Sequence, residues 1–380
     1  MNNRKENKRL AIDTHHLLLE NAGTKRVTLN ILNELYKHAE VQVVELKPSY
    51  RLSYGGGLAG KLAGHLFRFI WVHIHLPILC YKEKIDVLVS PEFNTPLFTT
   101  CKRVVIVHDV HMRAQREFNS SLWFYLYYIP FIEKAIKRAD LIITISDFAK
   151  LQIEKYMKIA ENKIIVVYWG VDQLFLSDTS IRVFELVSAQ YKILNDKYFL
   201  FVGTLEARKN VERIVEAFNV LQKCAGFNYT DLKLVIVGKP SISQFSDRSK
   251  EIKALVIKYE LEQKVIFCGF VPDDQLVALY ANALCLLFPS LYEGFGFPII
   301  EGFAMGTPVI TSNICSMPEV AGEAALLVDP YSVADLENKM ELMRGDSNLR
   351  SRLIACGKKR KEEFCWPATV NKIVKACIEL

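Results

Sequence analysis

Short apolar runs rich in β-branched residues alternate along the whole chain with segments in which apolar side chains recur at helical spacing. Such alternation is typical of βαβ units, in which crossover helices join parallel strands. The same order of elements runs through the chain twice, so we predict an α/β fold with two doubly wound, Rossmann-like domains. The predicted strands are residues 10–13, 41–46, 87–90, 103–108, 141–145 and 164–168, and then 198–203, 232–238, 265–267, 283–288, 308–311 and 325–328.

The segment from Asp172 to Lys197 has no clear period and contains a polar patch at residues 177–180, as is typical of a boundary between domains. We therefore predict an N-terminal, acceptor-binding domain over residues 1–176 and a C-terminal, donor-binding domain over residues 177–365. Residues 366–380 predict a terminal amphipathic helix that packs back on the N-terminal domain. Ligands of doubly wound sheets bind at the carboxyl ends of the strands, so we expect the active site between the two domains.

The chain has 380 residues, of which 51% are hydrophobic and 24% charged, as in a folded globular protein. Its net charge of +6 is uneven, because residues 1–175 hold 24 Lys and Arg against 17 Asp and Glu, and the remainder holds 24 against 25. This surplus is too small for a dedicated nucleic-acid binder. It suits an anionic ligand or an anionic membrane surface, and an ordinary solvated face explains it equally well.

The longest apolar stretch, residues 69–81, is interrupted by His73, His75 and Pro77 and is shorter than the roughly 20 apolar residues of a membrane span. We therefore expect no transmembrane helix. The polar N-terminus does not resemble a signal peptide, so we expect a cytoplasmic protein. Two alternatives stay open for residues 65–81: a segment that docks on the inner face of the cell membrane, or a buried core helix.

The most informative segment is residues 288–311, in which a buried strand leads into a glycine-containing loop and then a helix. Gly294 and Gly296 let the backbone approach a ligand closely, and the N–H groups at the helix start suit anionic oxygens. Glu293 and Glu301 flank this loop, where carboxylates can accept hydrogen bonds from sugar hydroxyls. Taken alone, the two residues would be ordinary exposed glutamates.

A second segment, residues 199–210, predicts a strand, a loop and a helix start with Asn210 as the N-cap. Gly203 ends the strand. Arg208 and Lys209 precede the helix, where a diphosphate would meet their charges and the helix dipole. Taken alone, they would be ordinary surface cations.

With these residues the chain resembles the retaining GT-B glycosyltransferases of the family 4, or group 1, type. Their hallmark is a glutamate, seven residues and a second glutamate, here Glu293 and Glu301, and the match continues through residues 316–330. The resemblance implies that Glu293 binds the transferred sugar and Glu301 the nucleotide ribose. It also implies that Arg208 and Lys209 bind the donor's diphosphate and stabilise the leaving nucleotide. The donor-binding set is Gly23, Gly203, Arg208, Lys209, Gly294, Phe295, Gly296 and Glu301.

The N-terminal half contributes His108, which stands at the carboxyl end of the predicted strand 103–108. The resemblance places this histidine against the donor sugar, as a catalytic residue. Gly23 stands in the predicted loop 21–26 after the first strand, where the family carries a glycine pair and this chain has Lys25 in the second place. A metal site at His108 and His111 lacks further ligands at suitable spacing.

We expect no metal and no cofactor beyond the nucleotide-sugar substrate. The chain has no Asp-x-Asp pair of the kind that holds a divalent ion in other transferases, and its nine cysteines contain no CxxC pair. Fixed cations can stabilise the departing diphosphate instead.

The predicted function is retaining transfer of a hexose from a nucleoside diphosphate sugar to a glycan or lipid-linked acceptor, in surface polysaccharide or lipopolysaccharide synthesis. Mannose is the favoured sugar, and GDP-mannose, UDP-glucose and UDP-N-acetylglucosamine all stay open. Two alternatives are a P-loop-like nucleotide hydrolase at Gly55 to Lys61, which lacks the following hydroxyl residue, and a catalytically silent GT-B scaffold.

Overall fold

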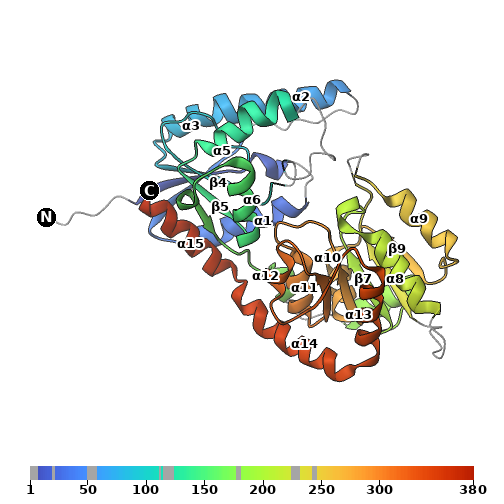
Figure 1. Cartoon of the computed structure of the whole chain (residues 1–380). Helices are drawn as coiled ribbons and strands as arrows, with labels where there is room; N and C mark the ends of the chain where they lie inside the picture. Colours follow the sequence, from blue (N-terminus) through green and yellow to red (C-terminus); the bar gives the residue numbers. More distant parts are fainter. Residues whose placement is uncertain are drawn as a thin grey trace. The chain divides into compact units, whose positions relative to one another are not determined.

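A computed structural model describes residues 7–18, 22–48, 58–110, 113, 124–176, 181–223, 232–241 and 246–380. The chain divides into two compact units (Figure 1), the N-terminal unit of Met1–Gly170 with Trp366–Leu380 and the C-terminal unit of Val171–Cys365. The division follows Gly170 and not residue 176, because the 3₁₀ helix Gln173–Leu176 packs on helices of the C-terminal unit and buries Phe175 edge-on to Tyr280.

The N-terminal unit is built on a parallel sheet in the order β2-β1-β3-β4-β5-β6. The predicted strands are confirmed, with ends that shift by a residue or two. Its strands are almost continuously apolar, as expected where helices cover both faces. They are β1 Lys8–Asp13, β2 Val41–Leu46, β3 Val87–Ser90, β4 Lys102–Ile106, β5 Leu141–Thr144 and β6 Ile164–Val166.

Helices connect and cover these strands. The final helix, α15, packs against α1 in this unit (Figure 1). A Cβ at Gly170 would lie 2.4 Å from the backbone nitrogen of Trp366, so glycine is needed where α15 begins. The helices are α1 Ala22–Leu35, α2 Leu58–Ile70, the π-helix Trp71–His75, α3 Leu76–Lys82, the π-helix Phe124–Glu133, α5 Lys134–Lys137, α6 Asp147–Met157 and α15 Trp366–Glu379, with 3₁₀ helices His15–Leu18 and Glu161–Lys163.

Residues Ala63–Lys82 form a continuous helical run, which corrects the expectation that no segment is long enough for a membrane span. Among the described residues this is the one helix that is long and apolar enough to cross a membrane. It has 20 residues, and 28% of its most apolar 18-residue segment is buried. Trp71, Val72, Leu76 and Cys80 pack on the sheet beside Ala11. A core helix meets the same criterion, so the run is weak evidence for a span.

The C-terminal unit repeats the plan with a parallel sheet in the order β12-β11-β10-β7-β8-β9. Its predicted strands are confirmed as well. Phe199, Phe201 and Phe218 are fully buried in its core. The strands are β7 Tyr198–Val202, β8 Lys233–Val237, β9 Val265–Gly269, β10 Cys285–Phe288, β11 Val309–Ser312 and β12 Leu326–Val328.

The helices of this unit follow the strands in turn. They are α7 Ile181–Tyr191, α8 Val211–Lys223, α9 Ser249–Lys258, α10 Asp273–Ala281, α11 Phe297–Met305, α12 Met317–Ala321, α13 Val333–Gly345 and α14 Ser347–Arg360, with 3₁₀ helices Gln173–Leu176, Ala207–Lys209 and Lys361–Glu363.

Each sheet has one switch point. There the strand order reverses, because later strands are added first on one side of the sheet's first strand and then on its other side. In the N-terminal unit the switch lies between β1 and β3, and in the C-terminal unit between β7 and β10. Crevices at the carboxyl ends of such strand pairs are where doubly wound sheets bind ligands.

Candidate functional site

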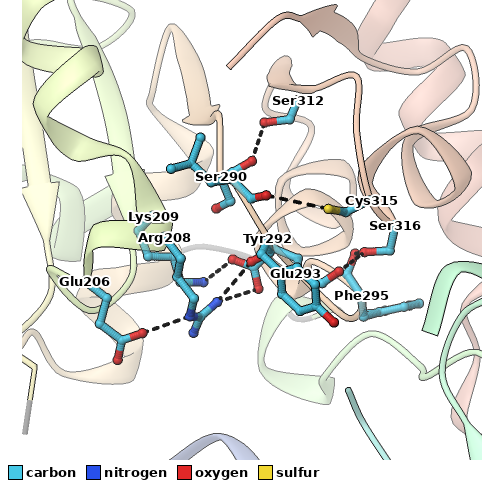
Figure 2. A network of polar contacts seen from close by, with 11 residues as sticks. Glu206, Arg208, Lys209, Ser290, Tyr292, Glu293, Phe295, Ser312, Cys315 and Ser316 are labelled. Carbon is cyan, nitrogen blue, oxygen red and sulfur yellow. Dashed lines mark hydrogen bonds and ion pairs between the residues drawn. The ribbon is translucent and has the colours of Figure 1, made fainter. Parts of the chain in front are cut away.

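The C-terminal unit gathers charged side chains at the β7/β10 switch point (Figure 2). Lys209 Nζ lies 2.6 Å from Glu293 Oε1, and Arg208 Nη1 lies 3.0 Å from Glu293 Oε2. Arg208 Nε also bonds Glu206 Oε2 at 2.9 Å. The two cations follow β7 and Glu293 follows β10, so the sheet topology brings together residues that are far apart in the sequence.

Burial governs the electrostatics of this network. Desolvation alone would raise the pKa of Glu293, but the charges of Lys209 and Arg208 and the hydrogen bond from Lys209 hold that pKa below its ordinary value. Burial lowers the pKa of Lys209, against the attraction of Glu293. Glu293 is therefore ionised at neutral pH and both of its oxygens face cations. A buried ion cluster of this kind is typical of functional sites.

Asn210 fixes the loop that carries the two cations. Its Nδ2 donates to the carbonyl oxygens of Pro289, at 2.9 Å, and Pro330, at 2.8 Å. Its backbone has φ 63°, in the left-handed region, and its Oδ1 accepts from Arg213 Nη1 at 2.7 Å. The prediction that Asn210 is an N-cap is therefore wrong, because its Oδ1 accepts from the Arg213 side chain and not from a backbone N–H of the first turn of α8, and its Nδ2 bonds carbonyls that are distant in the sequence.

The loop between β10 and α11 is held by a serine. Ser316 Oγ lies 2.9 Å from the carbonyl oxygens of both Glu293 and Phe295. Gly296 has φ 109°, a conformation that favours glycine, and it stands directly before α11 without a side-chain cap. The predicted arrangement of a glycine loop leading into a helix N-terminus is present here.

Glu301 lies on α11, where its Oε2 accepts a hydrogen bond from Tyr280 Oη at 2.7 Å. The tyrosine comes from α10, and no sequence pattern pointed to it. Gly203, which directly follows β7, has φ 155° and donates its N–H to the carbonyl of Val237 at 3.0 Å. Its carbonyl oxygen lies within 1.8 Å of where a Cβ of Gly238 would stand, so the β7 and β8 ends pack backbone to backbone.

His108 lies in the N-terminal unit, two residues after the end of β4, and both of its ring nitrogens have partners. Nε2 lies 3.0 Å from the carbonyl oxygen of Pro91, and Trp169 Nε1 donates to Nδ1 at 3.4 Å. Trp169 in turn stacks on Trp366. Burial lowers the pKa of His108, so the imidazole is neutral at pH 7. This assigns the Nε2–H tautomer, in which the ring donates to Pro91.

Other predicted positions need correction or lie outside the described residues. Gly23 is inside α1 and not in a loop, because α1 begins at Ala22. His111 and residues 55–57 lie outside the described part of the chain, and the rest of the P-loop-like segment begins α2. Within the described residues no group of three or more His, Cys, Asp or Glu is placed to hold a metal ion.

Comparison with known proteins agrees with this geometry. The family model described as "Glycosyl transferases group 1" matches residues 184–360, and the model described as "Glycosyltransferase Family 4" matches residues 22–173. A curated relative, O-antigen chain mannosyltransferase B of Escherichia coli, is 27% identical over 245 residues, which are 64% of this chain and 62% of the relative. The chain thus spans less than two thirds of that relative's length.

Solved structures match over nearly the whole chain. Sucrose-phosphate synthase from Thermosynechococcus elongatus superimposes with a TM-score of 0.76 at 20% identity, covering 98% of both chains. Anabaena Alr3699/HepE in complex with UDP-glucose gives 0.70 at 16% identity and covers 98% of this chain and 99% of its own. Two parallel sheets with flanking helices, together with these neighbours, define the GT-B fold. The chain belongs to the group 1 glycosyltransferases of the family 4 type.

Proposed function

We propose that this protein transfers a hexose from a nucleoside diphosphate sugar to a glycan or lipid-linked acceptor. The observation that carries the proposal is the Arg208–Lys209–Glu293 cluster at the β7/β10 switch point. The chemistry of sugar transfer leaves a nucleoside diphosphate whose negative charge grows as the glycosidic bond breaks. Two fixed cations in a buried site stabilise that charge more strongly than water does.

The donor must exchange partners with the protein when it binds. In the free protein the carboxylates of Glu293 and Glu206 occupy Arg208 and Lys209. A diphosphate takes over these cations, since it carries more charge and presents more acceptor oxygens than a carboxylate. Glu293 is then released to accept hydrogen bonds from hydroxyls of the transferred sugar. Glu301, on α11, accepts hydrogen bonds from the ribose hydroxyls in the same way.

We further propose that the transfer is retaining, as the family resemblance implies, and that it needs no metal. The acceptor attacks from the face that the diphosphate leaves, so the anomeric configuration is kept. The cations Arg208 and Lys209 and the start of α11 replace the divalent ion that other transferases use. His108, neutral and hydrogen bonded to Pro91, is our candidate for a catalytic residue contributed by the N-terminal unit.

Mannose is our favoured sugar, and surface polysaccharide synthesis our favoured context, on the strength of the O-antigen mannosyltransferase relative. The nucleotide stays open between GDP and UDP, since the HepE neighbour was solved with UDP-glucose. Incubation with GDP-mannose, UDP-glucose and UDP-N-acetylglucosamine in EDTA, with membranes of the source cell as acceptor, tests the proposal. Release of nucleoside diphosphate from one donor and NMR of the product's anomeric proton give donor and stereochemistry together.

Arg208→Ala should lower this transfer about a hundredfold or more, the usual loss when a group that stabilises developing charge is removed. Arg344→Ala is the matched control, because Arg344 also pairs with a glutamate, Glu341, but on the surface of α13. Transfer by folded Arg208→Ala at the wild-type rate would contradict the assignment of the site.

We also propose that the N-terminal unit contacts the inner face of the cell membrane. Leu66, Ile74, Ile78 and Tyr81 are exposed on the Ala63–Lys82 run, at spacings that share one helix face. The double variant Ile74→Glu, Ile78→Glu should lose flotation with anionic vesicles, and Leu186→Glu, at an exposed leucine of α7, should not. Wild-type protein that fails to float with such vesicles would remove this part of the proposal.

A further inference from the structure

The switch point of the N-terminal unit carries polar residues of a different kind from those of the C-terminal unit. Ile12 of β1 pairs with Val89 of β3, so the next residues, Asp13 and Ser90, lie side by side at the carboxyl ends of the two strands. Both are buried, with exposures of 1% and 0%. The charged cluster lies at the corresponding switch point, β7/β10, of the C-terminal sheet. We therefore expect a second ligand at the β1/β3 switch point.

Asp13 and His15 form a buried dyad at this point. His15 Nδ1 lies 2.9 Å from Asp13 Oδ2, and the His15 backbone N–H donates to Asp13 Oδ1 at 3.1 Å. Trp71 Nε1 donates to the same Oδ1 at 3.0 Å. Burial acts to raise the pKa of Asp13, but the charge and hydrogen bonds of His15 and the bond from Trp71 bring it below its ordinary value. The ionised carboxylate accepts the hydrogen bond of the His15 Nδ1–H, and Nε2 is the hydrogen-bond acceptor of that tautomer.

That acceptor has no partner in the described part of the chain, although it is buried. The same holds for the hydroxyl of Ser90 and, further along the loop that leaves β3, for the amide of Asn94 and the hydroxyl of Thr95. An unsatisfied buried polar group costs about 1–3 kcal/mol, and native proteins rarely keep one without a reason. A run of them at a ligand-binding edge indicates groups that are satisfied by a ligand.

The neighbouring side chains define the chemistry of that ligand. His16, whose Nε2 lies 2.7 Å from Thr28 Oγ1, has its pKa lowered by burial, with weaker contributions from Glu92, His15, Asp13 and His108. The groups with the largest effect on His16 are therefore carboxylates and imidazoles. Together with the hydroxyls of Ser90 and Thr95 and the amide of Asn94, such a set suits the hydroxyls of a neutral sugar.

We propose that His15, held by Asp13, binds a hydroxyl of the acceptor sugar. His15 Nε2 accepts the hydrogen bond of that hydroxyl, and Ser90 Oγ contacts the neighbouring one. This inference rests on the proposed function, because it takes the acceptor to be a pyranose. The charged β7/β10 switch point binds the donor and the β1/β3 switch point binds the acceptor. A substitution that abolishes binding at one switch point therefore need not abolish binding at the other.

The test is NMR of protein labelled with ¹⁵N-histidine, titrated with a panel of methyl pyranosides of mannose, glucose, galactose and N-acetylglucosamine. We expect a saturable shift of the His15 Nε2 resonance with at least one member of the panel. His15→Phe should weaken that pyranoside's binding about tenfold or more, and His15→Gln, which keeps an acceptor oxygen, should retain part of it. GDP and UDP should bind both variants within about twofold of wild type.

The matched control is His38→Gln. His38 also pairs with a carboxylate two residues away, since its Nδ1 lies 2.8 Å from Glu40 Oε1, but it lies on the surface beyond the end of α1. Failure of every pyranoside to move the His15 resonance would overturn this inference, even if GDP or UDP binds normally. Pyranoside binding at His15 without any nucleotide binding would support the sugar site and contradict the proposed donor chemistry, so the two failures are distinguishable.

Discussion

The two units of this protein have the same sheet topology around their switch points and differ in what they place there. At β7/β10 the chain sets two cations against a buried carboxylate, and at β1/β3 it sets a histidine–aspartate dyad among neutral hydroxyl and amide groups. In both units the strand order determines where the ligand-binding edge lies, and the side chains at the strand ends determine which ligand fits there. The comparison teaches that strand order predicts where to look in each half and that charge predicts what is bound.

Glu293→Gln is the change with the largest expected effect on the charged switch point. It leaves Lys209 buried beside Arg208 without a charged partner, and breaking a buried ion pair costs about 3–5 kcal/mol. Urea denaturation should show this loss in the free energy of unfolding. Glu341→Gln, at the surface pair with Arg344, should change that free energy by less than about 1 kcal/mol. Equal losses in the two variants would contradict the view that the β7/β10 cluster is special.

The same cluster predicts a pH dependence. The pKa of Glu293 is lowered in the folded protein from an ordinary value of 4.5, so its stabilising effect is complete above that pH and is lost as the pH falls through the folded-state pKa. The free energy of unfolding of wild type should therefore fall more steeply below pH 4.5 than that of Glu293→Gln. Parallel curves for the two proteins would show that Glu293 is not held ionised by its neighbours.

Asp13→Asn sharpens the other side of the comparison. An amide N–H₂ facing His15 Nδ1 would donate to it and move the ring proton to Nε2, which changes that nitrogen from an acceptor to a donor. We expect the ¹⁵N shifts of the two ring nitrogens to exchange character and pyranoside affinity to fall severalfold, with nucleotide affinity unchanged. An unchanged Nε2 shift would mean that Asp13 does not set the tautomer.

Asn210→Gly tests how the charged switch point is held together. Glycine keeps the left-handed backbone but removes the two bonds to Pro289 and Pro330, which should cost about 1–3 kcal/mol of stability. Because the cations of the neighbouring loop are then less fixed, the Kd for the nucleotide should also rise. Loss of stability with an unchanged nucleotide Kd would show that the loop needs no such support.

Ser146→Ala has the smallest expected effect, since it lies away from both switch points. Ser146 caps α6 by accepting from the Ala149 N–H at 3.0 Å. Loss of this cap should cost about 1 kcal/mol in thermal or urea denaturation. Nucleotide and pyranoside binding should stay as in wild type, and a change in either would show that general destabilisation mimics the site variants.

Local patterns were sufficient to predict the strands, because each parallel strand contains a short run of buried apolar residues. Local patterns placed Arg208, Lys209 and Glu293 after strands at the ligand-binding edge, and the resemblance to the family implied that all three bind the donor. Sequence patterns did not reveal the pairing of Glu293 with both cations, or the partners Glu206 and Tyr280. These contacts join segments whose approach depends on strand order, which local spacing does not record.

The misassigned residues have the same explanation. Asparagine is a common N-cap residue, but Asn210 bonds two distant carbonyls. Glycine is common in loops, but Gly23 lies within α1. Asp13 and His15 were not singled out by any motif. The signal that could have found them is their position at the carboxyl end of the first strand, because the loop after β7, the first strand of the C-terminal sheet, carries Arg208 and Lys209.

The most direct test of the account is calorimetric titration of GDP and UDP in EDTA into wild type, Arg208→Ala and His15→Phe. We predict that one nucleotide binds wild type without metal, that Arg208→Ala weakens this binding about tenfold or more, and that His15→Phe leaves it within about twofold. Absence of binding by either nucleotide in EDTA, or equal binding by wild type and Arg208→Ala, would contradict the assignment of the β7/β10 switch point to the donor.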